Sequence, residues 1–558
     1  MSWTDRLLGR PEPSEDTPNA QKGEFFAKWP VLPRSASRLL LRSILILVAI
    51  TAAICLYMLL TTTDSSESRL LKAASGPVSE ETYSDKQLYS GQRRFVVVVP
   101  ADGPNPDLCK LITSAIALGY PSPVIVNWGE TSFKVEGGFW GPYLGKISGT
   151  LEYLDRVTLP DTNKGDKLTD DDLVLIVDAY DVWFQLPPNM LLHRYHESNR
   201  KANARLAKQW GTSDEMPMKQ TILVSAQKRC FPTPKEGSNL HCDAVPESDL
   251  MPDIYGPQTD ANINHYHEVR PRFMNSGSFM GPAGDMKRYF RRVKERLEKG
   301  LAADLPYPGD QGIFAEIWGE QEVWRQWRRD FHSSLTGDLP KTEAAAFLQR
   351  DCEFHVGLDY SQNLFLPTVY EENDGRFVRL SDKAAIEKHS KELGISPIHL
   401  QGVPEDLVGT HNPLLDISPK ESIKTADWGD MPLYADFFTT AVPVVLHHNA
   451  WKHGLKERRT KWWDQTWYFS HLRQLLERQM KPGKLRPLVT LPTHNGQLEY
   501  FAPKSDAEKR KPRAYSQATV KTAFREIELD DVCRYEDETK DSKKHWYDEV
   551  FRDGKGPM

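Results

Sequence analysis

Residues 173–184 read LVLIVDAYDVWF, and this stretch decides the predicted fold. Its first five residues are aliphatic and lack the polar alternation of a half-exposed strand. Such a run is typical of a strand that is buried on both faces of a sheet. The strand ends at Asp178, and a second carboxylate follows at Asp181. Because two carboxylates that lie close together repel each other, we expect a cation or hydrogen-bond donors beside this pair.

The segments before this strand repeat the same kind of pattern. Residues 95–99 and 123–127 are apolar runs, and helix-compatible stretches follow them at 106–118 and 145–157. An alternation of strand and helix predicts parallel strands joined by right-handed crossovers. Ligands bind to such sheets in the crevice beyond the carboxyl ends of the strands. The sequence therefore predicts an α/β domain with its functional site just after residue 177.

Later segments extend this domain. Periodicity predicts further apolar strands at 221–226 and 443–446, and helices at 285–299, 311–327 and 463–480. Residues 330–440 show no regular periodicity. The chain after about residue 504 is charged and poorly periodic, so we expect it to lie on the surface.

A membrane span is predicted near the N-terminus. Residues 43–63 read SILILVAITAAICLYMLLTTT and contain no charged side chain. A helix of this length can cross a hydrocarbon core about 30 Å thick. Arginines precede the run at positions 34, 38 and 42, and Asp64 follows it. Because positive charge favours the cytosolic side, we expect a single-pass type II protein of the Golgi or ER membrane, with its C-terminal part in the lumen.

The chain of 558 residues then divides into five segments. These are a disordered cytosolic tail at 1–42, a transmembrane helix at 43–63, a lumenal stem at 64–92, a folded domain at 93–500 and a charged C-terminal extension at 501–558. The tail is polar and rich in proline, which favours disorder. The lumenal part is long enough to bury a large hydrophobic core.

Composition excludes two classes of protein. The formal net charge is −6 and the pI is near 6.3, whereas a nucleic-acid-binding protein should carry a basic excess. We therefore expect no nucleic-acid partner. The 15 tryptophans, 20 tyrosines and 22 phenylalanines are too many for an acidic disordered protein.

Cysteine is sparse. One of the six cysteines, Cys55, lies in the apolar run, and the other five form no C-x-x-C pair. A structural zinc site is therefore not expected. Because five is odd, at least one of these thiols has no disulfide partner within the chain. Cys230 and Cys242 flank a loop rich in proline and glycine and are placed to close a small disulfide.

Asp178 and Asp181 suit a hard divalent cation, which prefers oxygen ligands. Such an ion can bridge the two phosphates of a nucleoside diphosphate and stabilise the charge that develops as this group leaves. An acidic motif of the D-x-D kind after a buried strand is the metal site expected in a nucleotide-sugar transferase of the GT-A type. The alternative is that both carboxylates only cap the following turn.

Two further motifs follow predicted strands. The small residues around Asn275 and Gly277 allow the backbone to approach a ligand closely, although an ordinary tight turn explains them as well. His447 ends an apolar strand, and imidazole is a good ligand for a manganese-type ion. His448 and His494 have similar sequence surroundings and are rivals to His447, and a structural histidine is the remaining alternative.

These motifs keep one order along residues 93–450. They are Gly137-Gly138 with Gly145-Lys146, Asp178-Ala-Tyr180-Asp181, SAQKRCFP at 225–232, MNSGSFMG at 274–281, Gly309-Asp310-Gln311, GLDYSQNLF at 357–365 and VLHHNA at 445–450. In this order they resemble the glycosyltransferase domain of the procollagen lysyl hydroxylase and collagen glycosyltransferase family. That family has D-x-Y-D, S-A-E-x-x-C-x-P, L-N-S-G-G-F-I-G and V-V-H-G-N-G at the corresponding places.

The resemblance implies a GT-A-like fold for residues 93–500, a Mn²⁺ ion and a UDP-sugar donor. It implies that Asp178, Asp181 and His447 hold the metal and that Tyr180 packs against the uridine. It also makes Asp310 the catalytic candidate, in contact with the acceptor or the sugar. Lys146 is expected to face the donor phosphates, as a point charge would, and Asn275 and Gly277 are expected to line the donor site.

The chain departs from the family in several places. The last glycine of H-G-N-G is lost at Ala450, and the family's longer acidic run before Gln311 is missing. The hydroxylase domains of the larger members are absent, so a collagen acceptor is not implied. The membrane span instead favours a glycan, glycoprotein or glycolipid acceptor.

Three functions remain open at this point. The first is a metal-dependent enzyme that transfers a hexose from a UDP-sugar to such an acceptor. The second is a non-catalytic lumenal binding or scaffold protein on the same fold, which the altered motifs favour. The third is another metal-dependent phosphotransfer enzyme or nuclease, which the acidic pI and the predicted lumenal location disfavour.

Overall fold

The structure is a computed structural model. It describes residues 91–130, 141–211, 216–233, 240–303, 309–330, 352–417, 426–450, 455–493, 496–507, 510–515 and 524–558. The predicted tail at 1–42 and transmembrane helix at 43–63 lie outside these residues, as does the predicted stem up to residue 90. Gly137-Gly138 and His494 also lie outside them.

The described helices do not provide a membrane span. Within the described ranges, none is both long and apolar enough to cross a bilayer. The longest of them, α7 (Pro188–Trp210), carries arginines and lysines along its length, and a bilayer core does not accommodate such a helix. On this finding, the predicted fold class of a GT-A-like domain behind a transmembrane helix is wrong, and so is the predicted localisation in the Golgi or ER membrane.

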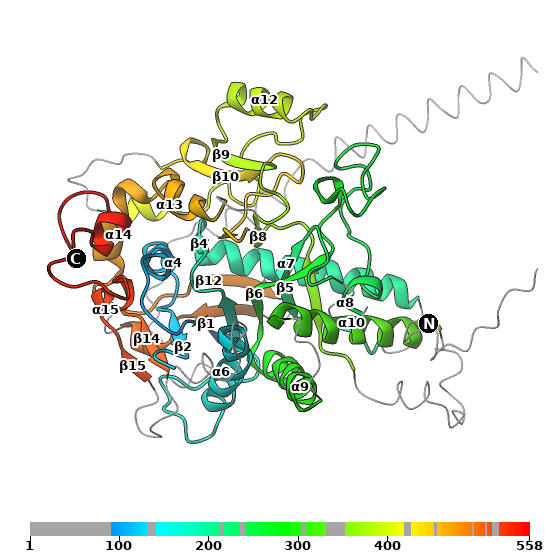
Figure 1. Ribbon diagram of the computed structural model, residues 1–558, viewed down its shortest axis with the longest axis horizontal. Helices are drawn as coiled ribbons and strands as arrows, with labels where there is room; N and C mark the ends of the chain where they lie inside the picture. Colours follow the sequence, from blue (N-terminus) through cyan, green and yellow to red (C-terminus); the bar gives the residue numbers. More distant parts are fainter. Residues whose placement is uncertain are drawn as a thin grey trace, which may run out of the picture. The chain divides into compact units, whose positions relative to one another are not determined.

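What the described residues form is a mixed α/β structure built on a large sheet flanked by helices (Figure 1). Ten strands belong to this sheet, in which eight follow the order β15-β14-β2-β1-β3-β6-β5-β7 while β13 pairs with β1 and β12. Their bounds are β1 Gln92–Pro100, β2 Val124–Val126, β3 Leu173–Val177, β5 Ile222–Gln227, β6 Phe273–Pro282, β7 Val356–Asp359, β12 Val489–Thr493, β13 Gly496–Phe501, β14 Arg513–Tyr515 and β15 Phe524–Glu526.

The first three strands of this sheet confirm the predicted alternation. β1 pairs in parallel with both β2 and β3, and helices α4 (Pro106–Ala117) and α6 (Gly141–Val157) connect them. β6 then runs antiparallel to β3 and to β5, so the sheet is mixed. All five residues of β3 are buried, as the aliphatic run predicts.

Helices cover the sheet and close the core. α6, α9 and α10 pack against one another. α6 also packs against β1 and β2, whereas α9 and α10 pack against β6. α4 packs against β4 (Val182–Phe184), α14, α15 and α16. The remaining α-helical bounds are α8 Leu240–Asp243, α9 Ala283–Ala302, α10 Gly309–Asp330, α12 Lys383–Glu392, α13 Arg458–Lys461, α14 Leu472–Gln479, α15 Leu529–Cys533 and α16 Trp546–Val550.

A small second sheet lies beside the end of β3. It has the order β4-β11-β8, with β4 at Val182–Phe184, β11 at Val445–His447 and β8 at Phe365–Pro367. β11 runs antiparallel to β4 and parallel to β8. A further antiparallel pair joins β9 (Gly375–Arg379) and β10 (Pro432–Asp436), and both of these strands come from the region without sequence periodicity.

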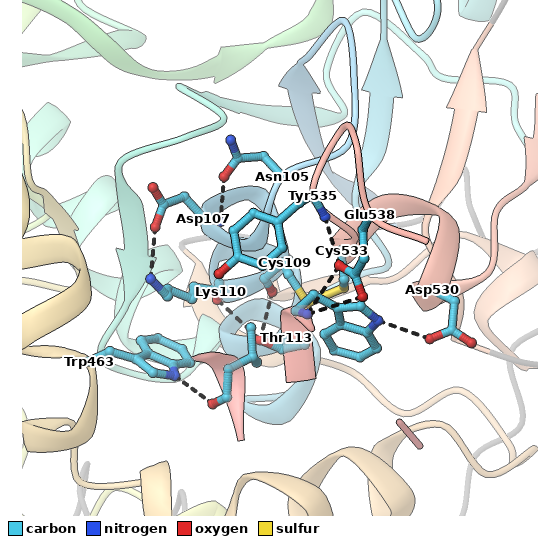
Figure 2. Close-up of a disulfide and its surroundings, with 12 residues drawn as sticks. Asn105, Asp107, Cys109, Lys110, Thr113, Trp463, Asp530, Cys533, Tyr535 and Glu538 are labelled. Atoms are coloured by element: carbon cyan, nitrogen blue, oxygen red, sulfur yellow. Dashed lines mark hydrogen bonds and ion pairs between the residues drawn. A yellow bond between two sulfur atoms is a disulfide. The ribbon is translucent and has the colours of Figure 1, made fainter. Parts of the chain in front are cut away.

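The C-terminal residues are part of this domain. β14 pairs in parallel with β2, and a disulfide joins Cys533 to Cys109 in α4 (Figure 2). Both sulfur-bearing residues are fully buried. The residues after 504, which the sequence assigns to the surface, therefore contribute two strands, β14 and β15, to the main sheet and helices to the core around α4.

The predicted small disulfide is also present. Cys230 and Cys242 are joined, with a sequence separation of 12, and this confirms the sequence prediction. Cys352 remains a buried thiol.

Candidate metal centre

Asp178 and Asp181 leave the sheet together at the carboxyl end of β3. The backbone amide of Asp178 donates to the Gly277 carbonyl at 2.9 Å, which is the last contact of β3 with β6. β4 begins at Val182, so the four-residue link between the two strands places both carboxylates at one sheet edge. Their side chains are 32% and 25% exposed, which leaves each accessible to a small ligand.

His447 reaches the same point from a distant part of the chain. The register of β11 on β4 places His447 opposite Val182, and the His448 amide donates to the Asp181 carbonyl at 2.6 Å. As a result, His447 Nε2 lies 3.2 Å from Asp181 Oδ1 and 3.6 Å from Asp178 Oδ2. The three side chains form a group whose ligand atoms all lie within 4.8 Å of one another.

His448, the first rival, points away from this group. Successive side chains of a strand face opposite sides, so only one of the two histidines can face the carboxylates. The His448 ring packs on Trp183 at a centroid distance of 3.9 Å and is 1% exposed. Burial lowers the pKa of His448 to about 3, which keeps it neutral in the core.

Asn275 fixes the orientation of the His447 ring. Its Oδ1 accepts a hydrogen bond from the Gly277 amide at 3.0 Å, and its Nδ2 donates to Gln227 Oε1 at 2.8 Å. Because one partner donates and the other accepts, these contacts identify which atom of the Asn275 side-chain amide is the oxygen and which is the nitrogen. Oδ1 lies 3.2 Å from His447 Nδ1, so Nδ1 carries a proton and donates it. The lone pair of the neutral ring is therefore on Nε2, which faces both carboxylates.

Gly277 makes room for this ring. A β-carbon at position 277 would lie 2.2 Å from His447 Cε1 and 2.3 Å from Nδ1, which no real side chain tolerates. The small residue predicted to allow close approach to a ligand thus makes space for a candidate ligand side chain. Together with Asn275, it holds the imidazole in one position, as outer-shell residues of metal sites do.

Lys146 and Asp310 are two further buried charged side chains beside this group. Lys146 Nζ lies 2.7 Å from Asp178 Oδ1 and 2.9 Å from Asp310 Oδ2, and it donates to the Ser276 carbonyl at 2.6 Å. The Ser276 hydroxyl donates to the same Asp310 oxygen at 2.9 Å. Lys146 comes from α6 and Asp310 from the first turn of α10, and both are 6% exposed. The lysine thus bridges Asp178, a candidate metal ligand, and Asp310, the catalytic candidate.

The electrostatics of the group are set by burial and by charge pairing. Burial disfavours charge on Asp181, but the nearby His447 outweighs it and holds the pKa of Asp181 at about 2. Burial opposes the imidazolium of His447 as well, yet Asp181 and then Asp178 raise the pKa of His447 above its usual value. Burial raises the pKa of Asp178 despite Lys146 and His447. A proton on His447 therefore occupies the place that a metal cation would take.

Tyr180 lies at the rim of the group. Its hydroxyl donates to Asp102 Oδ1 at 2.8 Å and accepts from the backbone amide of Gly103 at 3.3 Å, in the loop after β1. Arg459 Nη1 donates to the Tyr180 carbonyl at 2.7 Å. The tyrosine ring is half-buried and packs against the main hydrophobic core.

The sequence motifs did not single out four of these residues individually. Ser276 and Gln311 lie inside quoted motifs, and Gln311 Oε1 accepts from the Ser276 amide at 3.2 Å. Gln227, which orients Asn275, lies where the resembling family has glutamate. Arg459 lies in none of the quoted motifs. Its position depends on how the segment of residues 455–493 packs against β4 and α4.

Comparison with protein-family models and with curated proteins found no match.

Proposed function

We propose that this protein is a metal-dependent glycosyltransferase that takes a hexose from a UDP-sugar. The acceptor class in this proposal is a glycan, glycoprotein or glycolipid. The convergence of Asp178, Asp181 and His447 at the end of β3 is the observation that supports it most directly. The resemblance of the ordered motifs to the procollagen lysyl hydroxylase and collagen glycosyltransferase family is the second support.

The residues fit a Mn²⁺ ion. Two carboxylate oxygens and one neutral imidazole nitrogen are a donor set that manganese accepts. The Nδ1 contact to Asn275 directs Nε2 of His447 toward the carboxylates, as in sites where an outer residue orients the ligand. When bound, the cation would stabilise the negative charge that develops on a diphosphate leaving group.

The remaining residues suggest how the chain would handle its substrates. Both contacts of Asp310 with Lys146 and Ser276 use Oδ2, so in this proposal Oδ1 accepts the proton of the acceptor hydroxyl. Lys146 would hold Asp310 at a fixed distance from Asp178. The Tyr180 ring would support the nucleoside, because its hydroxyl is tied to the loop after β1.

One observation favours a second candidate, a non-catalytic binding protein. Lys146 is already neutralised by Asp178 and Asp310, so it is not a free cation for the donor phosphates as the sequence predicts. A protein of this kind would bind a nucleotide sugar without transferring it.

Donor hydrolysis separates the two candidates. The full chain is incubated with a panel of UDP- and GDP-sugars, with and without Mn²⁺, alongside Asp181→Ala and the control Asp541→Ala, which changes an exposed carboxylate. The proposal expects manganese-dependent cleavage of one donor that is lost in Asp181→Ala and kept in the control. Donor binding without cleavage would support the second candidate, and full turnover by Asp181→Ala would refute the first.

A further inference from the structure

A second group of charged side chains is buried away from the first. Glu371 and Asp374 lie in the turn between β8 and β9, and Asp436 ends β10. Lys228, just after β5, lies against Asp374 and donates to the His267 carbonyl at 3.1 Å. All four side chains belong to residues that are at most 6% exposed.

The three carboxylates converge on one point. Their ligand oxygens all lie within 4.8 Å of one another. Pairing of β9 with β10 places Asp436 opposite Gly375, next to Asp374, and the Phe437 amide donates to the Asp374 carbonyl at 2.9 Å. Oxygen ligands of a Ca²⁺ ion lie at about 2.3–2.6 Å from it, so two of them can be separated by no more than about 5 Å. The spacing of this group satisfies that limit.

The charges of the group do not balance. Lys228 supplies one positive charge against three carboxylates, which leaves two negative charges when all groups are ionised. An uncompensated charge in a protein interior is costly, so two protons or one divalent cation must be present. Burial raises the pKa of Glu371 well above its usual range and that of Asp436 to about 6, which shows how strongly this environment disfavours unpaired carboxylates.

An unsatisfied side-chain oxygen points to a cation rather than to protons alone. Gln362 is fully buried, and its Nε2 donates to Glu371 Oε1 at 2.5 Å, so its carboxamide borders the group at Glu371. Its Oε1 has no hydrogen-bond donor, and neither has Glu371 Oε2. Buried oxygens without a donor are rare in folded proteins because each loses its hydration without compensation. A cation would satisfy both atoms.

We propose that Glu371, Asp374 and Asp436, with the amide oxygen of Gln362, bind a Ca²⁺ ion. The donor set contains oxygen only and is preferred by calcium, whereas the group at His447 includes a nitrogen and suits manganese. This proposal does not depend on the function proposed for the first group.

The proposed calcium site supports the strand that bears His447. The turn that contains Glu371 begins at Thr368, whose amide donates to the His447 carbonyl at 2.9 Å. The Thr368 hydroxyl donates to the Asn449 carbonyl at 2.9 Å, and the Val369 amide donates to Asn449 Oδ1 at 3.2 Å. Calcium would therefore fix the turn against which the end of β11 is held.

Calcium binding by the full chain tests this proposal. The protein carries Asp181→Ala so that the first group does not contribute, and Glu371→Gln is added in a second sample. The glutamine can still accept the Gln362 hydrogen bond, so the fold should survive. Glu405→Gln, which changes an exposed residue, is the matched control. Bound Ca²⁺ is counted by equilibrium dialysis with metal analysis at pH 7.5, and the melting temperature is measured with Ca²⁺ and with a chelator.

We expect one Ca²⁺ per chain and a calcium-dependent rise in melting temperature in the Asp181→Ala protein and in the control. Adding Glu371→Gln should weaken calcium binding at least tenfold and remove the temperature rise. Absence of bound calcium in the Asp181→Ala protein would mean that protons neutralise the group, and the proposal would fail. It would fail equally if calcium binding persisted unchanged in Glu371→Gln. If Glu371→Gln does not fold, Gln362→Met provides the same comparison, with weaker calcium binding expected.

Discussion

His447 lies so close to Gly277 that a β-carbon at position 277 would be 2.2 Å from His447 Cε1. The contact joins β6 of the main sheet to β11 of the small sheet. It leaves the imidazole one position, with Nδ1 on Asn275 and Nε2 on the carboxylates. The geometry of this candidate metal centre therefore depends on a residue that is not one of its candidate ligands.

Gly277→Ala should displace the His447 ring and weaken Mn²⁺ binding by about tenfold or more, as loss of outer-shell support does in metal sites. The measurement is a Mn²⁺ titration followed by electron paramagnetic resonance. Gly483→Ala is the control, because a β-carbon there meets nothing within 4 Å. Equal affinity in the two variants would show that His447 does not bind the metal.

Asn275→Ala should also weaken Mn²⁺ binding, by about 10-fold to 100-fold, because the ring loses the acceptor that fixes its tautomer. Calorimetric titration with Mn²⁺ measures the change. The exposed Asn264→Ala serves as control and should bind like the wild type. A wild-type affinity in Asn275→Ala would remove the assigned role of the Nδ1 contact.

Rising pH should weaken the contribution of His447 to stability in the metal-free protein but should strengthen Mn²⁺ binding. The raised pKa of His447 means that, without metal, its charged form contributes stability that is complete below the unfolded pKa of about 6.5. That contribution is lost as the pH rises through the higher pKa of the folded state. Mn²⁺ needs the neutral ring, so its affinity should instead rise over the same pH range.

Urea unfolding between pH 6 and 9 with and without Mn²⁺, in the wild type and in His447→Asn, checks this reversal. The variant should lose both trends. A wild-type Mn²⁺ affinity that does not change with pH would contradict the assignment of His447 as a ligand.

Lys146→Met should destabilise the fold by about 3 kcal/mol, because removal of one partner leaves the carboxylates of Asp178 and Asp310 without their cation. Mn²⁺ should restore part of this loss. Urea unfolding measures both effects. Lys201→Met, at a side chain that is 63% exposed, should change stability by less than about 0.5 kcal/mol. No loss in Lys146→Met would mean that the lysine does not stabilise this group.

Loss of the Cys109–Cys533 disulfide should destabilise the protein more than loss of the Cys230–Cys242 disulfide. The sequence separations are 424 and 12, and a longer loop gains more conformational entropy when it is opened. The expected cost of Cys109→Ala with Cys533→Ala is about 2–5 kcal/mol in urea unfolding. Figure 2 shows the surroundings of this bridge, with Asp530 among them. Trp546 Nε1 donates to Asp530 Oδ1 at 3.2 Å. A smaller loss of unfolding free energy for the Cys109–Cys533 pair than for the Cys230–Cys242 pair would contradict this prediction. It would mean that α15 and α16 hold the C-terminal segment without the bridge.

Local sequence determined the features that depend only on residues close together along the chain. The aliphatic run 173–177 forms β3 with the predicted bounds, because five such side chains can be buried only inside a sheet. The same run places Asp178 and Asp181 at the sheet edge. Cys230 and Cys242 form the predicted bridge because a short loop keeps them close together. The predicted membrane span at 43–63, also a local pattern, is the exception that the described helices do not support.

Tertiary structure decided what depends on register between distant segments. Strand alternation allowed either His447 or His448 to face the carboxylates, and only the pairing of β11 with β4 selected His447. The pairing of Lys146 with Asp178 and Asp310 required α6, β3 and α10 to meet. Likewise, β14 entered the main sheet from a charged segment because β2 offered it a partner strand. No pattern of neighbouring residues records such contacts, since the free energy that selects them comes from packing between segments far apart in the chain.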